Sequence, residues 1–484
     1  MKGFILFFAA MLPCLSAIAG DAPERDFMEV NVTEPGKLAE LLGERANEID
    51  SLVVSGTIDA TDFDAMWSAT FYGNLLAINL ENAKITDGKV PDNAFYHHEA
   101  QHVAGSIKLI GLQRIILGEG VTEIGASAFL YAANLREITL PKSLRKLGDN
   151  SFSDCYRLMT SPLVIPEGVT AIPRRCFIGC RALSEVVLPS TIRSIGDMAF
   201  FSSKITKINF PEGLEKIENC AFYATRLKEV TLPESCLTLE GEGHFSLNYE
   251  LERLTLPSGL TAIPNGLADN CMSLTEVNIP SGVTEIGKEA FYLCPLSGNM
   301  KLPEGLTQIG GRAFSGSSGL TEVTFPSTLA DLGQLSCEGW SGVRVIRCCS
   351  AVPPHCAISP KGFGSFGEPD YSVNGGILTN IPVYIPKGSI ELYRNAPGWD
   401  CFFNFIETDN PSASITAVTG DDAPAIAGEG NEIVISGCDG HYAIYTLDGT
   451  TIAAGNAGAG EVRVTVASGC YIVNAAGAVK KIRI

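Results

Sequence analysis

A motif of about 23 residues recurs along most of the 484-residue chain, and this repeat restricts the possible folds more than any other feature. Leu-Arg-Glu-Ile-Thr-Leu-Pro at 135–141 recurs as Leu-Ser-Glu-Val-Val-Leu-Pro at 183–189 and as Leu-Thr-Glu-Val-Asn-Ile-Pro at 274–280. An Ile-Gly or Ile-Pro pair follows most copies. The units begin at residues 112, 135, 158, 183, 205, 227, 251, 274, 296, 320 and 343.

Each unit contains the parts of one solenoid turn. Leu-x-x-Val-x-Leu alternates, which predicts a short strand with one buried face. The proline ends this strand because it has no N–H to donate, and the glycine after isoleucine is expected to supply a turn with unrestricted φ. A phenylalanine closes most units and should fill the interior: Phe129, Phe152, Phe177, Phe200, Phe222, Phe291 and Phe314, with Ala268 and Cys337 in its place in two units.

A single unit cannot bury its own apolar face, whereas stacked units form a continuous core. The sequence therefore predicts a β-rich solenoid, with short parallel strands about 4.8 Å apart. The pattern L-x-x-[IV]-x-L-P-x-x-[VL]-x-x-I-[GP]-x-x-A-F-x-x-C over 112–345 resembles BspA-like leucine-rich repeats, which occur in surface proteins of anaerobic Gram-negative bacteria. That resemblance implies adhesion to host extracellular-matrix proteins, other bacteria or mucosal surfaces.

The segments that flank the repeats differ from them in composition. We interpret residues 20–111 as an N-terminal cap with irregular first repeats, including an amphipathic helix within 33–50. Residues 346–407 should form the C-terminal cap, with aromatic side chains that plug the last repeat. Residues 408–430 are rich in Asp, Ala, Gly, Pro and Ser and are predicted to be a linker. Short alternating strands over 431–484 predict a small β-sandwich.

The C-terminal segment also carries a second resemblance. Ile-Tyr-Thr-Leu-Asp-Gly at 444–449, Gly-Cys-Tyr-Ile-Val at 469–473 and Lys-Lys-Ile-Arg-Ile at 480–484 resemble the C-terminal sorting domain of type IX secretion. The resemblance implies that the secretion machinery carries the chain through the outer membrane, after which it is attached to the surface or released. The alternative is a β-sandwich without a sorting role.

Residues 1–19 have the pattern of a secretory signal peptide. Lys2 precedes an apolar run over 4–15, and Ala17-Ile18-Ala19 offers a cleavage site. The run is too short to span a membrane as a helix. Cys14 could instead be a lipoprotein cysteine, but Pro13 lies where a small residue is expected. We therefore expect an exported protein, at the cell surface or secreted, without a transmembrane helix.

The charge balance and the motifs exclude several function classes. The chain has 35 basic and 54 acidic residues and a net charge of −19, which argues against binding nucleic acid or anionic lipid. Neither a Ser-His-Asp arrangement, nor a phosphate-binding loop, nor a dinucleotide fingerprint stands out. The sequence therefore predicts neither enzyme activity nor a cofactor.

One segment still matches a catalytic motif. His98-Glu99-x-x-His102 fits H-E-x-x-H, in which a helix places both histidines on one face to bind zinc and the glutamate acts as base. The segment is an insertion of about ten residues, which is too short for a protease helix with its cleft. We interpret it as a solvated loop and keep a zinc hydrolase and incidental metal binding as alternatives.

Fourteen cysteines follow Cys14, and an even number in an exported chain permits disulfides. Their spacing does not match a zinc site. Cys155 and Cys180 occupy equivalent positions in neighbouring units, as do Cys271 and Cys294, so each pair could be bridged or could be reduced and buried.

The outward strand positions form columns of polar residues and are the candidate binding face for host or bacterial surface proteins. The alternative is that these residues are β-formers and solvating charges on an exposed sheet. A glycan-capturing face would need exposed aromatic platforms, but Trp67, Trp340 and Trp399 all lie outside the columns. The candidate residues are Glu137, Thr139, Glu185, Asn209, Glu229, Thr231, Arg253, Thr255, Glu276, Asn278, Glu322 and Thr324.

Overall fold

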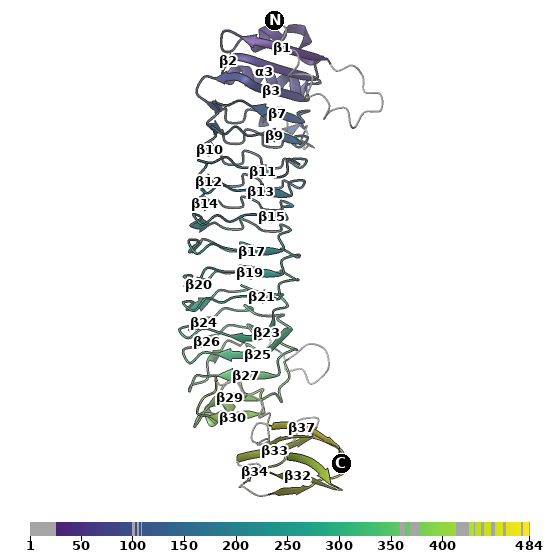
Figure 1. Ribbon diagram of the computed structural model, residues 1–484, viewed down its shortest axis with the longest axis vertical. Helices are drawn as coiled ribbons and strands as arrows, with labels where there is room; N and C mark the ends of the chain where they lie inside the picture. Colours follow the sequence, from purple (N-terminus) through teal and green to yellow (C-terminus); the bar gives the residue numbers. More distant parts are fainter. Residues whose placement is uncertain are drawn as a thin grey trace. The chain divides into compact units, whose positions relative to one another are not determined.

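The computed structural model of the chain is a β-solenoid with parallel strands about 23 residues apart, followed by antiparallel sheets at the C-terminus (Figure 1). It describes residues 26–98, 102–103, 106–107, 109–358, 364–367, 377–412, 425–429, 431–436, 440–446, 451–457, 461–475 and 478–483. The predicted leader, residues 1–19, lies outside this range. The chain divides into two compact units. The first extends to Leu296 and includes Ile309–Ser317, and the second comprises Ser297–Gln308 and Ser318–Ile484.

The predicted strands form the first wall of the solenoid, and this prediction is confirmed. In the first unit a parallel sheet has the order β1 (Phe27–Val32), β2 (Ser51–Ile58), β3 (Ala77–Ile85), β7 (Arg114–Leu117) and β9 (Glu137–Thr139). Two three-stranded parallel sheets follow: β11 (Leu163–Val164), β13 (Glu185–Val187) and β15 (Lys207–Ile208), then β17 (Glu229–Thr231), β19 (Arg253–Thr255) and β21 (Glu276–Val277). In most of these strands alternate residues are buried and form the inward face, whereas Ile208 of β15 and Val277 of β21 are only half-buried.

A second wall, which the sequence analysis missed, forms where only a turn was expected. The isoleucine of each Ile-Gly or Ile-Pro pair, or the residue at the same position in other turns, belongs to a two-residue strand, and all of these residues except Leu239 are buried. The strands are β4 (Lys89–Val90), β8 (Glu123–Ile124), β10 (Lys146–Leu147), β12 (Ala171–Ile172), β14 (Ser194–Ile195), β16 (Lys216–Ile217), β18 (Thr238–Leu239), β20 (Ala262–Ile263), β22 (Glu285–Ile286) and β24 (Gln308–Ile309). Within the first unit, successive strands pair in parallel from β12 to β18.

The glycines of the Ile-Gly pairs are needed for space rather than for a positive φ, which corrects the prediction. A Cβ atom at Gly196 would lie 2.8 Å from the backbone nitrogen of Arg174, and one at Gly287 would lie 2.6 Å from that of Asn265. Neither glycine has a φ in the left-handed region. Adjacent turns therefore approach too closely here for a side chain that points toward the preceding turn.

The closing phenylalanines fill the interior, as predicted. Phe129, Phe152, Phe177, Phe200 and Phe222 are 0% exposed, and their rings stack at centroid distances of 5.2–5.4 Å from turn to turn. The main chain at these residues joins the turns as well, because the N–H of each closing phenylalanine donates to a carbonyl of the next turn. The closing segment is therefore the third wall.

The N-terminal segment contains one predicted helix and one that was not predicted. α2 (Leu38–Leu42) and a 3-10 turn (Gly43–Asn47) lie within the predicted 33–50 region. α3 (Ala60–Phe71) replaces part of the expected irregular repeat. Its capping box joins Asp59 and Asp62, and the buried Asp62 carboxylate also accepts the N–H of Leu38 at 2.8 Å. A buried acceptor shared in this way fixes α2 against α3.

The second unit begins with further solenoid strands. β23 (Ser297–Lys301), β25 (Gly319–Phe325), β27 (Val345–Cys348), β29 (Val383–Pro386) and β30 (Phe405–Thr408) form a parallel sheet, and β26 (Asp331–Leu332) pairs with β28 (His355–Cys356). Within and after α5 (Ile390–Arg394), buried aromatic side chains cover the last turns. Tyr393 Oη donates to the carbonyl of Ser350 at 2.7 Å, and Trp399 Nε1 donates to that of Pro354 at 2.9 Å.

The C-terminal antiparallel sheets include two strands that were not predicted. β31 (Ala425–Glu429), β32 (Glu432–Ser436) and β35 (Val462–Thr465) form one sheet, and β34 (Thr451–Ala457), β33 (Gly440–Thr446), β36 (Cys470–Ala475) and β37 (Ala478–Arg483) form the other. The two strands that were not predicted are β31 and β34. β31 lies within the predicted linker. Its Ala-Gly-rich sequence has a weak strand signal, and pairing with the apolar β32, with Ile426 opposite Ile435, makes it a strand.

Candidate binding face

The structure places most of the candidate residues on the solvent side of the first wall. Exposed in the first unit are Glu137, Thr139, Asn209, Glu229, Thr231, Arg253, Glu276 and Asn278, while Glu185 and Thr255 are half-buried. In the second unit Glu322 is half-buried and Thr324 is only 7% exposed, so Thr324 is not part of an exposed face, although it alternates with the inward Val323 and Phe325. Thr324 lies opposite Lys301 on one side and opposite Arg347, itself buried, on the other.

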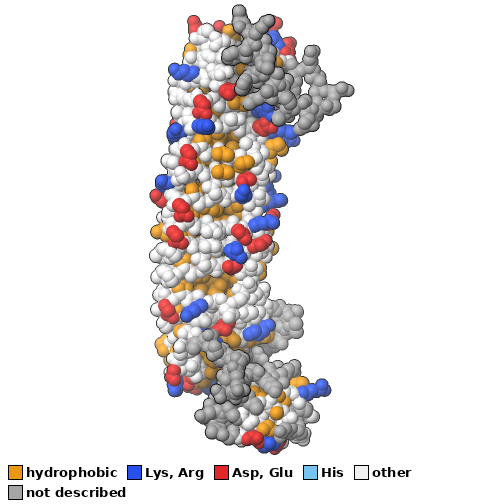
Figure 2. All heavy atoms as spheres, viewed as in Figure 1, with side chains coloured by type: hydrophobic (Ala, Val, Ile, Leu, Met, Phe, Trp, Pro, Cys, Tyr) orange, Lys and Arg blue, Asp and Glu red, His pale blue; other side chains and the backbone are white. Residues whose placement is uncertain are grey.

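The charged residues of this face pair with one another across turns. Glu185 binds Lys207 at 2.7 Å, and Arg253 binds Glu276 at 2.9 Å and Glu229 at 3.8 Å. The hydrogen bond that Arg253 donates to Glu276 raises the pKa of Arg253. Acidic and basic side chains are interspersed in the same way over the side of the molecule drawn in Figure 2. Such exposed pairs each contribute at most about 1 kcal/mol, so they shape the surface more than they stabilise it.

Two residues of the face have a structural role that the sequence analysis missed. The side chain of Asn209 accepts the N–H of Leu188 at 2.7 Å and donates to its carbonyl at 2.9 Å. Asn278 makes the same two bonds with Leu256, at 2.7 and 2.9 Å. Each asparagine follows the last strand of a three-stranded sheet, β15 or β21, and its amide replaces a main-chain rung. The signal in the sequence was asparagine in a column that is mostly threonine.

Replacing Asn278 by alanine is expected to lower the free energy of unfolding by about 1–2 kcal/mol, because the two backbone groups of Leu256 lose their partners. Urea denaturation of the purified chain measures the change. Thr231→Ala, an exposed position in the same column, is the matched control and should change stability by no more than about 0.5 kcal/mol. Equal effects of the two substitutions would contradict the role of Asn278.

The face is interrupted between β15 and β17, which do not pair with each other. A hollow of about 310 Å³ opens there, and we call it the notch. It is lined by Thr206, Lys207 and Ile208 of one turn, Leu227, Lys228 and Glu229 of the next, and Glu252 of the third.

The structure does not support the zinc motif. His102 belongs to β5 (His102–Val103), which pairs with β6 (Ser106–Ile107) in a short antiparallel hairpin. A strand at His102 cannot supply the i, i+4 spacing on one helix that the motif requires. Glu99 lies outside the described residues. Among the residues that the structure does describe, no group of three or more His, Cys, Asp or Glu side chains could hold a metal ion.

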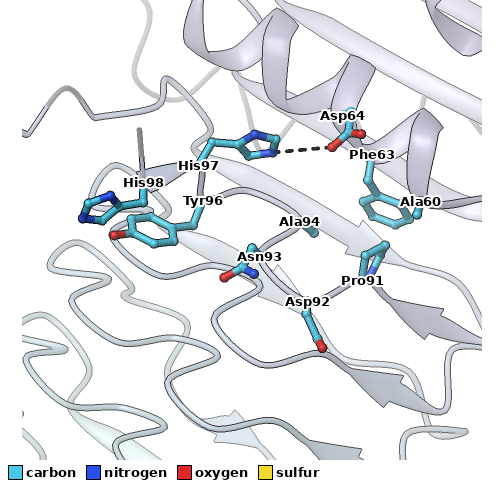
Figure 3. Close-up of a pocket in the computed structure, with 10 residues that line it drawn as sticks. All are labelled: Ala60, Phe63, Asp64, Pro91, Asp92, Asn93, Ala94, Tyr96, His97 and His98. Atoms are coloured by element: carbon cyan, nitrogen blue, oxygen red, sulfur yellow. Dashed lines mark ion pairs between the residues drawn. The ribbon is translucent and has the colours of Figure 1, made fainter. Parts of the chain in front are cut away.

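A larger hollow of about 490 Å³ lies beside this segment, between α3 and the turn that leads to His98 (Figure 3). His97 points toward Asp64, with Nε2 3.5 Å from Oδ1, and its ring stacks on Trp67 at 3.9 Å. Asp92 is already bound, by Lys89 Nζ at 2.8 Å and by the N–H of Ala126 at 2.9 Å, and the bond from Lys89 lowers its pKa. The ten residues drawn include no Ser, Thr, Cys or Lys that His97 could activate as a nucleophile.

The cysteines that were candidates for disulfides are free thiols in the structure. Cys155, Cys180, Cys271 and Cys294 are buried, and each Sγ lies 3.0–3.2 Å from a backbone carbonyl of the preceding turn. Burial raises the pKa of Cys155 and of Cys180 well above the ordinary value. The structure therefore shows the reduced, buried alternative.

In the folded protein, Cys155 and Cys180 are expected to resist alkylation by iodoacetamide, because burial excludes the reagent and disfavours the thiolate. The half-buried Cys349 is the internal control and should react at least ten times faster. Peptide mass spectrometry after timed quenching measures both rates. A Cys155–Cys180 cross-link in the protein isolated without reductant would show that the bridged alternative is correct.

The remaining sequence hypotheses concern aromatic platforms and membrane anchoring. Trp67, Trp340 and Trp399 are at most 7% exposed, so none of them offers a platform to a glycan. Within the described part of the chain, the longest apolar helices fall short of what crossing a bilayer requires.

Comparison with known proteins identifies the repeats. A family profile described as BspA type leucine rich repeat region matches residues 107–225, 159–267 and 217–343. None of the curated proteins matches the chain significantly. A leucine-rich repeat protein from Bacteroides ovatus is 24% identical over 59% of this chain and 88% of its own, with a TM-score of 0.41. A leucine rich cell surface protein from Faecalibacterium prausnitzii is 20% identical over 62% and 83%, with a TM-score of 0.36. The pneumococcal vaccine antigen PcpA is 17% identical over 74% and 79%, with a TM-score of 0.39.

Proposed function

Because residues 107–343 are a region of BspA-type leucine-rich repeats, we propose that this chain is a non-enzymatic interaction protein displayed on the cell surface or secreted. In this proposal it is an adhesin that binds host extracellular-matrix proteins or other cells through the first wall. The observation that carries the proposal is the row of exposed polar side chains that successive parallel strands present on one face. Extended faces of this kind are how solenoid proteins bind their partners.

The other sites argue for binding rather than catalysis. His102 lies on a strand, His97 faces a carboxylate without a nucleophile among the residues that line its hollow, and Cys155 and Cys180 are buried with raised pKa values. A perturbed group in a cleft would favour an enzyme, but the buried thiols face the solenoid interior. The exposed face is the surface on which a partner has access to many side chains at once.

An array of matrix proteins and glycans, probed with the full chain, tests this function. The face variant carries Glu137→Lys, Thr231→Lys and Glu276→Lys. The control variant carries Glu240→Lys, Ala262→Lys and Glu285→Lys on the second-wall side, with the same change in net charge. We expect the wild type to bind at least one matrix protein, with a loss of at least tenfold in the face variant and not in the control. Failure of the wild type to bind, or equal losses in both variants, would refute the proposal.

The sorting role of the C-terminal sheets is a separate part of the proposal. Truncation before β31, which removes residues 425–484, is expected to leave the protein in the periplasm of its producing cell. Protease accessibility on intact cells, compared with the full chain, measures surface display. A truncated chain that still reaches the surface would show that these sheets do not act as a sorting domain.

A further inference from the structure

The main chain of the third wall has one direction along the solenoid. Through most turns, the N–H groups of the closing residue and of the residue two positions before it donate to carbonyls of the next turn. Phe129 N–H donates to Ser151 O at 2.8 Å. At the same position of the following turn, Phe152 N–H donates to Cys176 O at 3.0 Å. The N–H groups of this ladder therefore point toward the C-terminal turns, and the carbonyls that accept them point toward the N-terminal turns.

The turn formed by residues 92–95 begins the third wall and has the conformation of the later turns. Asn93 has a φ of +58°, in the left-handed region that the equivalent residues of later turns share, and its N–H donates to Ala126 O at 2.8 Å. The carbonyls of Asp92 and Ala94 occupy the positions that accept hydrogen bonds in the later turns. They therefore point toward the element that precedes this turn in the stack, which is the helix α3.

Neither of these two carbonyls receives a hydrogen bond from the residues that the structure describes. The first N–H groups of α3 are not available, because its capping box uses them: Thr61 N–H donates to Asp59 Oδ1 at 2.9 Å, and Asp62 N–H to Asp59 O at 3.2 Å. Ala94 is only 3% exposed. Buried main-chain carbonyls are nearly always paired, so an unpaired one beside a hollow indicates that a donor from outside the chain binds there.

The hollow drawn in Figure 3, which we call the α3 hollow, lies between α3 and this turn and collects oxygen acceptors. Asp64 of α3 lines it, with a carboxylate that is 65% exposed. A carboxylate accepts several donors, so the contact with His97 at 3.5 Å leaves room for another. The Asp92 side chain points away from α3, toward its partners Lys89 and Ala126. The ten lining residues include neither Lys nor Arg, so the hollow holds acceptors without a cation among them.

We propose that the α3 hollow binds the guanidinium group of an arginine side chain from a partner polypeptide, through the Asp92 and Ala94 carbonyls and the Asp64 carboxylate. This inference goes beyond the proposed function, which concerns the first wall.

The shape and the donors of a guanidinium match the α3 hollow. A guanidinium holds five N–H donors in one plane and so bonds to two carbonyls and a carboxylate together, whereas an ammonium is a compact, strongly hydrated charge with three donors. Its flat face also stacks on aromatic rings, and Tyr96 lines the hollow. The volume of about 490 Å³ lies within the range for ligand pockets and admits the stem of the side chain, against Ala60 and Pro91.

Titration of the full chain with N-acetyl-arginine methylamide tests this inference. The chain carries isotope-labelled histidine, and the ring signals are assigned by substitution. We expect the probe to shift the signals of His97 and His98 in a saturable manner and to leave that of His355, whose side chain is 74% exposed outside the hollow, unchanged. The citrulline analogue, an uncharged molecule of the same shape, should bind at least tenfold more weakly, and the lysine analogue at least threefold more weakly.

Two variants locate the bound probe. Asp64→Asn should weaken binding at least fivefold, and Ala60→Trp, which fills the hollow from the exposed start of α3 without a change in charge, should abolish it. Asp331→Asn is the matched control, because Asp331 is also exposed and lies 3.4 Å from a histidine, His355; it should bind the arginine probe as the wild type does. Absence of a saturable shift in the wild type, equal binding of the citrulline or lysine analogue, or equal losses in Asp64→Asn and Asp331→Asn would overturn the inference.

Discussion

Replacing Phe177 by alanine is expected to lower the free energy of unfolding by about 3–5 kcal/mol, the usual loss for a fully buried phenylalanine. Phe177 is 0% exposed and stacks between Phe152 and Phe200, with both centroid distances at 5.4 Å. Removal of the ring leaves a cavity and takes a stacking partner from two neighbouring turns at once. The effect should therefore spread to the turns before and after the substitution.

Urea denaturation followed by circular dichroism measures the loss. Phe403→Ala is the matched control, because Phe403 is 64% exposed and its removal should change stability by no more than about 0.5 kcal/mol. The chain itself tolerates alanine at one closing position, Ala268, which is preceded by the buried Leu267. Phe177 is preceded by the smaller Cys176, which does not fill the interior as Leu267 does beside Ala268. A loss below about 1 kcal/mol for Phe177→Ala would therefore mean that the stack is not a main source of stability.

Replacing His244 by leucine is expected to flatten the dependence of stability on acid pH. His244 is 0% exposed, its Nδ1 is buried without a hydrogen-bond partner in the described structure, and burial lowers the pKa of the imidazole to about 4 from the ordinary 6.5. The unfolded chain gains a proton on this histidine as the pH falls below 6.5, whereas the folded chain does not until about pH 4. The contribution of the neutral His244 to the free energy of unfolding is therefore fully present above pH 6.5. It is lost between pH 6.5 and pH 4, by on the order of 3 kcal/mol.

Denaturation midpoints measured from pH 8 to pH 4 on both proteins give the comparison. Leucine is a suitable replacement, because the next turn carries the buried Leu267 at the equivalent position. His355→Gln is the control, since the His355 side chain is 74% exposed, and its pH profile should follow that of the wild type. Carboxylates contribute acid sensitivity to every variant, so the difference between His244→Leu and wild type isolates the histidine. Parallel profiles for these two proteins would show that His244 does not cause the loss.

The repeat in the sequence by itself determines most of the fold. A period of about 23 residues with alternating apolar positions leaves a stack of turns as the way to bury leucine, valine and phenylalanine together. Ile138, Phe129 and their equivalents are buried as that argument requires. The same alternation placed Glu137 and Glu229 on the solvent side, so the candidate face was largely predictable. Thr324, in β25, departs from it because Lys301 of β23 and the buried Arg347 of β27 lie directly opposite it on its two sides.

Only the tertiary structure decided the hydrogen-bond register between one turn and the next. A residue's neighbours in a solenoid are mostly 22 to 24 positions away, so a change of one residue in turn length shifts the hydrogen bonds without altering the local pattern. The second wall, the amide of Asn209 on Leu188, and the absence of pairing between β15 and β17 all depend on that spacing. The pattern of one turn specifies which side chains are buried, whereas register between turns arises only when their backbones come within hydrogen-bonding distance.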